Sequence, residues 1–312
     1  MFVNTNMNIS ILIPCFNWDI YNLVIMLNNL CIEEPRLKKF EILCLEDAST
    51  RFFSNKNISQ LKNTQHEILP KNIGRSKIRN LMAQKGQYEW LLFIDSDSKI
   101  TNPFFIRKYV DCVEQHKNKI NFKQTDLKTI YYGSTIYSDK KPNSKKILHW
   151  KYGKNIESKR KNTNFSSHHF LIQKKEFQQN NTQFDEKIKS YGYEDVFFII
   201  MNQLKPVYIK NPAHHIGIKT TQQFIHDTES SLKNLMTYSK KKEIEERIKI
   251  TKVSKILSQF QLNHIIIIFF NILRSIIVKN LYSKNPSLLL FQFYKLGFFL
   301  KESKNFDLIK KS

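Results

Sequence analysis

The chain has 312 residues, of which 41% are hydrophobic and 13% aromatic, so it can bury a substantial core and is not a disordered chain. Its formal net charge is +23, from 50 Lys and Arg against 27 Asp and Glu, and an excess of this size attracts polyanions. Lys, Asn and Ile are abundant throughout, however, and no zinc-finger, homeodomain or RNP-type motif is present, so a nucleic-acid partner is not expected.

Over the first hundred residues, continuous apolar runs alternate with segments whose apolar residues have helical spacing. The runs that predict strands cover residues 9–14, 40–45, 66–69 and 90–94. The segments with helical spacing cover residues 19–31 and 75–84. This alternation implies right-handed βαβ units, and the predicted fold class is therefore α/β with a mostly parallel sheet and flanking helices.

The middle of the chain is more mixed. Residues 129–133 and 170–173 predict two further strands, separated by a Lys-rich segment, 139–161, that we expect to be a solvated loop. A helix is predicted to begin at Glu194 and Asp195, after Gly192, because acidic residues in a first turn suit the helix dipole.

The C-terminal residues differ in character from the rest. Residues 229–259 are charged and predicted to be helical, and apolar helical runs follow at 262–278 and 288–300. Neither run reaches about 18 uninterrupted apolar residues, which a confident membrane span needs. Lysines flank both runs, as in a helix that lies on a membrane surface. The alternative is a helical hairpin packed on the preceding domain. We therefore predict one domain over 1–235 and a basic, apolar helical extension over 236–312.

Two carboxylates follow the strand predicted at 90–94. An apolar run of this kind delivers Asp95, Ser96 and Asp97 to the carboxyl edge of a sheet, where open α/β sheets bind ligands. Carboxylate oxygens suit a divalent cation that also carries phosphate oxygens. The alternative is an Asp-rich turn without a ligand.

The cysteines and the N-terminus bear on the cellular compartment. Cys15 and Cys44 lie in apolar, strand-like segments, and none of the four cysteines forms a CxxC pair. Free buried thiols favour a reducing compartment. The first ten residues lack the basic and apolar regions of a secretory signal, so a cytoplasmic location is expected, with peripheral contact at the cytoplasmic membrane face as an extension of that expectation.

Several segments, in order, resemble the family 2 glycosyltransferases, which have the GT-A fold. They are SILIPCFN at 10–17, EDAS at 46–49, NIGRSKIRN at 72–80, DSD at 95–97, YGYED at 191–195 and NPAHHIG at 211–217. The resemblance covers roughly residues 8–235. It implies a GT-A type, Rossmann-like sheet and a metal-dependent inverting transfer of a sugar. The implied donor is a UDP- or GDP-sugar and the implied acceptor a saccharide or a lipid-linked sugar, in surface polysaccharide or glycolipid assembly.

The same resemblance assigns the site residues. The implied nucleotide-sugar site comprises Pro14, Asn17, Glu46, Asp47, Asn72, Gly74, Arg79, Asp95 and Ser96. Asp97 is the implied direct ligand of Mn²⁺ or Mg²⁺, with Asp95 beside it and His215 as a third ligand. Asp195 is the implied general base, with Glu194 next to it. His168 and His169 are not expected to be ligands, because consecutive strand residues face opposite ways.

Departures from the family pattern leave the donor open. Glu46 and Ala48 stand where the family has Asp and Gly, and Cys15 and Phe16 replace a small polar residue and Tyr. Two other functions remain. A nucleotidyltransferase would use similar carboxylates but would need a Gly-rich phosphate loop, which Pro14–Asn17 is not. A basic nucleic-acid-binding protein would bind any duplex in a salt-sensitive manner and would be indifferent to chelators.

Overall fold

The computed structural model describes residues 7–51, 53–120, 128–159, 165–179, 182–188, 191–239 and 241–309. The chain divides into two compact units. The sheet unit comprises residues 1–138, 157–189 and 194–217, and the helical unit comprises 139–156, 190–193 and 218–312. The predicted boundary at residue 235 falls inside helix α7 (Thr221–Tyr238), and the division at that residue stays a prediction.

The sheet unit is built on one eight-stranded sheet in the order β3-β2-β1-β4-β7-β6-β8-β5. Its strands are β1 (Met7–Cys15), β2 (Leu37–Glu46), β3 (Thr64–Ile68), β4 (Trp90–Ile94), β5 (Ser98–Lys99), β6 (Thr129–Ile136), β7 (His169–Gln173) and β8 (Lys205–His215). The pairs β3–β2, β2–β1, β1–β4 and β6–β8 are parallel, whereas β4–β7, β7–β6 and β8–β5 are antiparallel. The predicted mostly parallel sheet is therefore confirmed, with its antiparallel pairs towards the β5 side.

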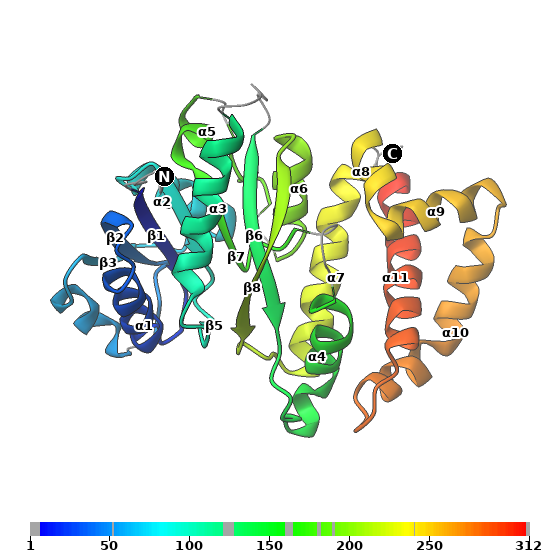
Figure 1. Ribbon diagram of the computed structural model, residues 1–312. Coiled ribbons are helices and arrows are strands. Elements are labelled where there is room, and N and C mark those ends of the chain that lie inside the picture. The colour runs from blue at the N-terminus through cyan, green and yellow to red at the C-terminus, as the bar shows by residue number, and fades with distance from the viewer. Residues whose placement is uncertain are drawn as a thin grey trace. The chain divides into compact units, whose positions relative to one another are not determined.

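Helices cover both faces of this sheet (Figure 1). They are α1 (Tyr21–Ile32), α2 (Arg75–Lys85), α3 (Phe105–Ile120), α5 (Lys174–Gln179) and α6 (Glu194–Met201), with a 3-10 turn, η1, at Ser54–Gln60. Because strand side chains alternate between faces, Ile11 and Leu92 pack with α1 and α3, whereas Leu12 and Phe93 pack with α2, α5 and α6. Both faces are apolar, which is why the sequence shows near-continuous apolar runs.

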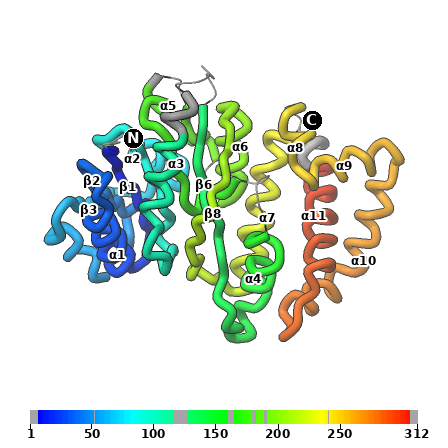
Figure 2. Tube along the Cα trace, viewed as in Figure 1, coloured from blue at the N-terminus to red at the C-terminus, as the bar shows by residue number. Residues whose placement is uncertain are grey.

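The helical unit contains the other helices. They are α4 (Ile147–Tyr152), α7 (Thr221–Tyr238), α8 (Lys242–Arg247), α9 (Lys249–Gln259), α10 (Asn263–Leu281) and α11 (Leu288–Ile309). A 3-10 helix, η2 (Ser144–Lys146), precedes α4, and a π-helix, η3 (Gly153–Glu157), follows it and ends in the sheet unit. The two apolar C-terminal helices predicted from the sequence are confirmed, and α10 and α11 lie side by side (Figures 1 and 2).

The Lys-rich segment is a mostly exposed loop at 139–146, as expected, but not beyond it. Of residues 139–161, the last two lie outside the described residues, and α4 occupies the centre. Leu148 and Tyr152 of α4 are buried, and the rings of His149 and Tyr152 lie 4.4 and 5.6 Å from that of Phe224 in α7. The prediction was wrong for this part of the segment, because it overlooked a short apolar helix that contacts with α7 and α11 stabilise.

Candidate functional site

Polar residues collect where β1, β2 and β4 end. These strands are parallel and adjacent, with Cys15 opposite Glu46 and Leu12 opposite Phe93, so the residues that follow them meet at one edge. Asn17 ties this edge together. Its amide oxygen accepts hydrogen bonds from the backbone N–H groups of Thr50 (2.8 Å) and Arg51 (3.0 Å), and its own N–H donates to Ser49 Oγ (2.9 Å). The Asn17 side chain therefore shapes the loop that follows β2.

Asp47 joins the end of β2 to the start of α2. Its carboxylate accepts hydrogen bonds from the backbone N–H groups of Ile73 (2.6 Å) and Gly74 (2.9 Å), while Asn72 Nδ2 donates to the Asp47 carbonyl (3.0 Å). Gly74 caps α2 with a φ of +85°, and a Cβ there would meet nothing within 4 Å. Backbone conformation, rather than lack of space, thus requires this glycine. Contact of these residues with a nucleotide stays a prediction.

Glu46 is buried behind this edge. Asn55 Nδ2 and His66 Nε2 each lie 2.9 Å from Glu46 Oε1. Burial alone would raise the pKa of Glu46, but hydrogen bonds from Ser49, Asn55 and His66 hold it below its ordinary value. This carboxylate therefore links β2 to β3 and η1.

Pro14 and Ser96 lie at the ends of β1 and β4. Pro14 pairs with Leu45 in the sheet, and both Pro14 and Ser96 are half-buried. Their predicted contact with the nucleotide-sugar stays a prediction.

Asp95 lies in a network of four charges. Arg79 Nη2 donates to Asp95 Oδ1 at 2.6 Å, and Arg75 Nη2 lies 3.6 Å from Asp95 Oδ2. The same two arginines lie 3.8 and 3.7 Å from Glu194 Oε1. The network joins α2, the end of β4 and the start of α6, and it holds these three elements in a fixed relation.

The two arginines differ in exposure. The Arg79 side chain is 2% exposed and lies over the ring of Phe184, whereas the Arg75 side chain is 44% exposed. Arg79 is predicted to contact the nucleotide, and that stays a prediction. Arg75, which we did not select from the sequence, is the one that solvent reaches. Its position one turn before Arg79 on α2 was the available signal.

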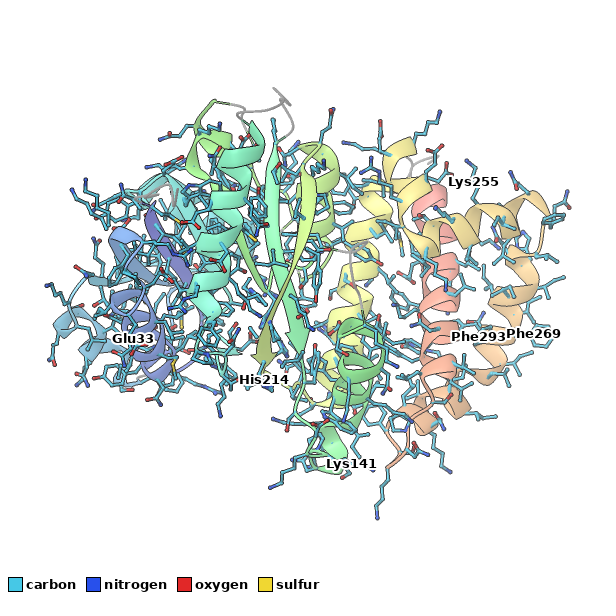
Figure 3. The ribbon with its side chains drawn as sticks, viewed as in Figure 1. Glu33, Lys141, His214, Lys255, Phe269 and Phe293 are labelled. Carbon is cyan, nitrogen blue, oxygen red and sulfur yellow. The ribbon has the colours of Figure 1, made fainter. Side chains whose placement is uncertain are left out.

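Asp97 contacts His215 where β5 pairs with β8. The two-residue strand β5 pairs with β8 so that Ser98 lies opposite His215, and Ile216 N donates to the Asp97 carbonyl at 2.9 Å. Asp97 Oδ2 lies 3.1 Å from His215 Nε2. His214, labelled in Figure 3, precedes His215 on β8 and so belongs to the opposite face of that strand.

Electrostatics reinforce this pair. Burial raises the pKa of Asp97, but the charge and hydrogen bond of His215, then His168 and Arg75, hold it far below its ordinary value. Burial lowers the pKa of His215, but Asp97, with smaller contributions from Glu157 and Asp95, raises it above its ordinary value. Each partner thus favours the charged form of the other.

Gly217 leaves room for the Asp97 carboxylate. A Cβ at this position would lie 2.2 Å from Asp97 Oδ2 and 2.9 Å from Asp97 Cγ. Any other residue would therefore displace the carboxylate.

His168 lies behind the pair. Its Nε2 is 3.0 Å from Ser98 Oγ, and its ring centroid is 5.5 Å from that of His215. Among the described residues, its Nδ1 has no hydrogen-bond partner. Burial, and then the charge of His215, lowers the pKa of His168 to about 4, so the ring is neutral near pH 7. His169 instead bonds Tyr109 at 2.6 Å.

A divalent cation would find two protein ligands here. Across the described ranges, no group of three or more His, Cys, Asp and Glu side chains is arranged to hold a metal ion. Asp97 and His215 fit as a pair, because a carboxylate oxygen and an imidazole nitrogen lie together. Asp95 faces the arginines instead. The predicted Mn²⁺ or Mg²⁺ would therefore need phosphate oxygens and water to complete its coordination.

Glu194 and Asp195 occupy different environments in the first turn of α6. Glu194 is buried beside the two arginines. Asp195 is half-buried, and its Oδ1 accepts a hydrogen bond from the backbone N–H of Val196 at 2.8 Å. Of the two carboxylates, Asp195 is the more accessible.

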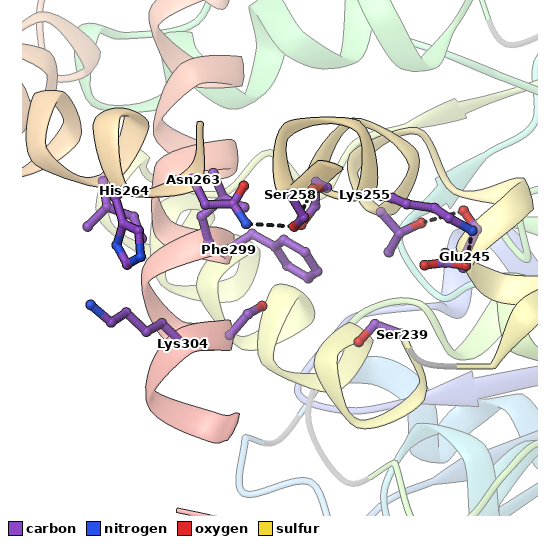
Figure 4. A pocket seen from close by; sticks show the side chains of 13 residues that line it. Ser239, Glu245, Lys255, Ser258, Asn263, His264, Phe299 and Lys304 are labelled. Atoms are coloured by element: carbon purple, nitrogen blue, oxygen red, sulfur yellow. Dashed lines mark hydrogen bonds and ion pairs between the residues drawn. The ribbon is translucent and has the colours of Figure 1, made fainter. Parts of the chain in front are cut away.

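A cavity of about 540 Å³ lies elsewhere, in the helical unit (Figure 4). It is lined by residues that include Ser239, Lys255, His264, Phe299 and Lys304. None of the predicted site residues lines it.

No protein-family model and no curated protein matches the sequence. Among solved structures, the chain is similar to S. aureus TarS, with 17% identity and a TM-score of 0.48, over 75% of this chain and 40% of that one. It is also similar to S. aureus TarS 1-349 in complex with UDP, with 15% identity and a TM-score of 0.48, over 97% and 92% of the two chains. For TarS 1-349 in complex with UDP-GlcNAc, identity is 16%, the TM-score 0.47 and the coverage 96% and 92%.

Proposed function

We propose that this protein is a metal-dependent, inverting glycosyltransferase that moves a sugar from a UDP- or GDP-sugar to a saccharide or lipid-linked acceptor in surface polysaccharide or glycolipid assembly. One observation carries the proposal. Asp97 and His215, far apart in sequence, meet at 3.1 Å beside a glycine that no other residue can replace without moving the carboxylate. Asp97 follows the carboxyl end of β4 and His215 is the last residue of β8, and open α/β sheets bind ligands outside the carboxyl ends of their strands.

The donor would bind along this edge. Asp97 and His215 would hold the cation, which supplies Lewis-acid stabilisation of the charge on the leaving nucleoside diphosphate. Arg75, the exposed arginine of the charge network, would contact a phosphate oxygen. From the resemblance, Asp47 would contact the base and Asp95 the ribose, with Asn17 at the rim, and the hydrogen bonds described above fix the loops of all three.

Asp195 would act on the acceptor. Its carboxylate takes the proton of an acceptor hydroxyl while that oxygen forms a bond to the anomeric carbon. The bond from that carbon to the diphosphate oxygen breaks, and the nucleoside diphosphate leaves with the electron pair. One displacement inverts the configuration, so a single base suffices, without the second carboxyl group that hydrolases use.

Nucleotide binding tests the metal pair. Isothermal titration of UDP and GDP, with Mn²⁺ or with a chelator, should show metal-dependent binding that Asp97→Asn weakens by at least about tenfold. Asp195→Asn is the matched control and should bind as the unchanged protein does. Metal-dependent binding of equal strength in Asp97→Asn would contradict the proposal.

Turnover tests the base. Release of nucleoside diphosphate from UDP- and GDP-sugars, with water in place of the acceptor hydroxyl, should fall by about 10²–10⁴-fold in Asp195→Asn while nucleotide affinity stays the same. Undiminished turnover in this variant would show that another group accepts the proton.

A further inference from the structure

One side of α10 exposes a continuous apolar surface. Ile265, Ile268, Phe269, Ile272 and Ile276 are between 48% and 67% exposed, and their spacing of i, i+3, i+4, i+7 and i+11 places them on one face (Figure 3, where Phe269 is labelled). We call these five residues the α10 face. Contiguous exposed apolar surface of this kind marks an interaction site.

The opposite side of α10 is fixed to α11. Phe270, Ile277 and Leu281 are buried, and Phe270 fits so closely against Gly297 that a Cβ there would lie 2.4 Å from its ring. Lys301 Nζ also donates to Asn271 Oδ1 at 3.1 Å. The α10 face is therefore held on a packed hairpin and has no partner within the described part of the helical unit.

The apolar surface continues along the chain into α9. Ile256 is 52% exposed and Phe260 is 69% exposed, and Leu262 joins them to the start of α10. The α10 residues that line the cavity in Figure 4 are Asn263, His264 and Ile267, none of which belongs to the α10 face. The cavity and the α10 face are thus separate features.

Charge indicates what covers this face. From Arg247 to Lys301 the sequence has nine Lys and Arg and no Asp or Glu. Lys252, Arg274, Lys279 and Lys284 of this stretch are exposed. A second copy of the chain would bring the same positive charges and be repelled, whereas anionic lipid headgroups complement them.

We propose that the α10 face lies on the surface of an anionic lipid bilayer, with the helix axis in the membrane plane. By length and composition, α10 could cross a membrane. However, the polar residues Asn271, Arg274 and Ser275 lie near its middle, and its buried side packs on α11. The helix α11 is in turn bonded to α7, because Tyr294 Oη donates to Glu229 Oε1 at 2.5 Å. Crossing would break these contacts, whereas surface binding keeps them. This proposal does not depend on the proposed function.

Vesicle flotation of the full chain tests it. The protein should float with vesicles of phosphatidylcholine containing about one-third phosphatidylglycerol, and much less with phosphatidylcholine alone. The triple variant Ile268→Ser, Phe269→Ser, Ile272→Ser should lower partitioning by about a hundredfold, because it removes three inserted apolar side chains. The matched control is Met26→Ser, Ile32→Ser, Ile68→Ser, which changes exposed apolar residues of the sheet unit and should leave flotation unchanged.

Three outcomes would overturn the proposal. The first is equal flotation of the two triple variants, each with a circular-dichroism melt like that of the unchanged protein. The second is a dimer, seen by light scattering without vesicles, that the α10 variant dissociates, since the face would then join two copies. The third is resistance of the membrane-bound protein to alkaline carbonate, which would indicate a spanning helix.

Discussion

At the residue scale, the carboxylates of the acidic motifs differ in burial and in their bonding partners. In Glu46–Asp47 and Glu194–Asp195 the first carboxylate is buried in structural contacts. Asp95 is likewise bonded to a buried arginine, whereas Asp97 faces a histidine at the open edge. A short acidic motif therefore does not supply two equivalent ligands. In Asp95–Asp97 and Glu194–Asp195 the two carboxylates differ in environment, whereas both members of Glu46–Asp47 are buried in structural contacts.

Gly217 gives the sharpest test at this scale. Gly217→Ala should weaken Mn²⁺-dependent nucleotide binding by at least about tenfold, because the new Cβ would displace the Asp97 carboxylate. Only the end of a flexible side chain has to move, so we expect a loss of stability below about 1.5 kcal/mol. Titration calorimetry and urea unfolding measure the two quantities. The neighbouring exposed Ile216→Ala is the control and should change neither. A Gly217→Ala protein that binds normally would show that Asp97 can serve from another position.

At the element scale, a buried carboxylate joins three elements that also share an apolar core. Glu34 follows α1, and its side chain is 3% exposed. It accepts hydrogen bonds from Arg36 (2.8 Å), just before β2, and from Arg107 of α3 (3.2 Å), while Arg36 also bonds Asp111 of α3. These bonds hold α1, β2 and α3 together at one end of the sheet.

Replacing Glu34 should reveal this connection through its pH dependence. Burial alone would raise the pKa of Glu34, but hydrogen bonds from Arg36 and Arg107 hold it below its ordinary value of 4.5. Its contribution is therefore complete above pH 4.5 and lost as the pH falls through the lowered folded-state pKa. Glu34→Gln should cost about 2 kcal/mol at pH 7 and less at pH 3, measured by urea unfolding. A cost that does not depend on pH would mean that shape, and not charge, carries the contribution.

Periodicity predicted the strands that have a continuous apolar run, and it missed elements of several lengths. The strands at 9–14 and 90–94 lie within β1 and β4, because residues buried on both faces leave a clear apolar run. The sixteen-residue helix α3 and the eleven-residue strand β8 were not predicted. The helix α4 and the strand β5 were missed, since six and two residues carry too little pattern to be recognised. Their existence depends on partners distant in sequence, α7 and β8.

At the scale of the whole molecule, the net charge of +23 must bring some affinity for any polyanion. Binding to a labelled DNA duplex, followed by fluorescence anisotropy, should weaken by at least about tenfold between roughly 50 and 300 mM salt and should not respond to a chelator. UDP binding with Mn²⁺ should change by less than about threefold over the same range, because its contacts are local and partly desolvated. Duplex binding that survives high salt and depends on sequence would instead indicate a specific nucleic-acid partner.

The sequence by itself determined the α/β class, the order of most strands and helices, and the choice of Asp95, Asp97 and His215 as candidate metal ligands. Alternating burial and motif order are local properties, so they can be read along the chain. Only the tertiary structure decided that Asp97 meets His215 while Asp95 meets Arg79, and that α10 keeps one apolar side exposed. Those outcomes depend on strand pairing and helix packing between segments far apart in sequence, whose geometry no local pattern contains.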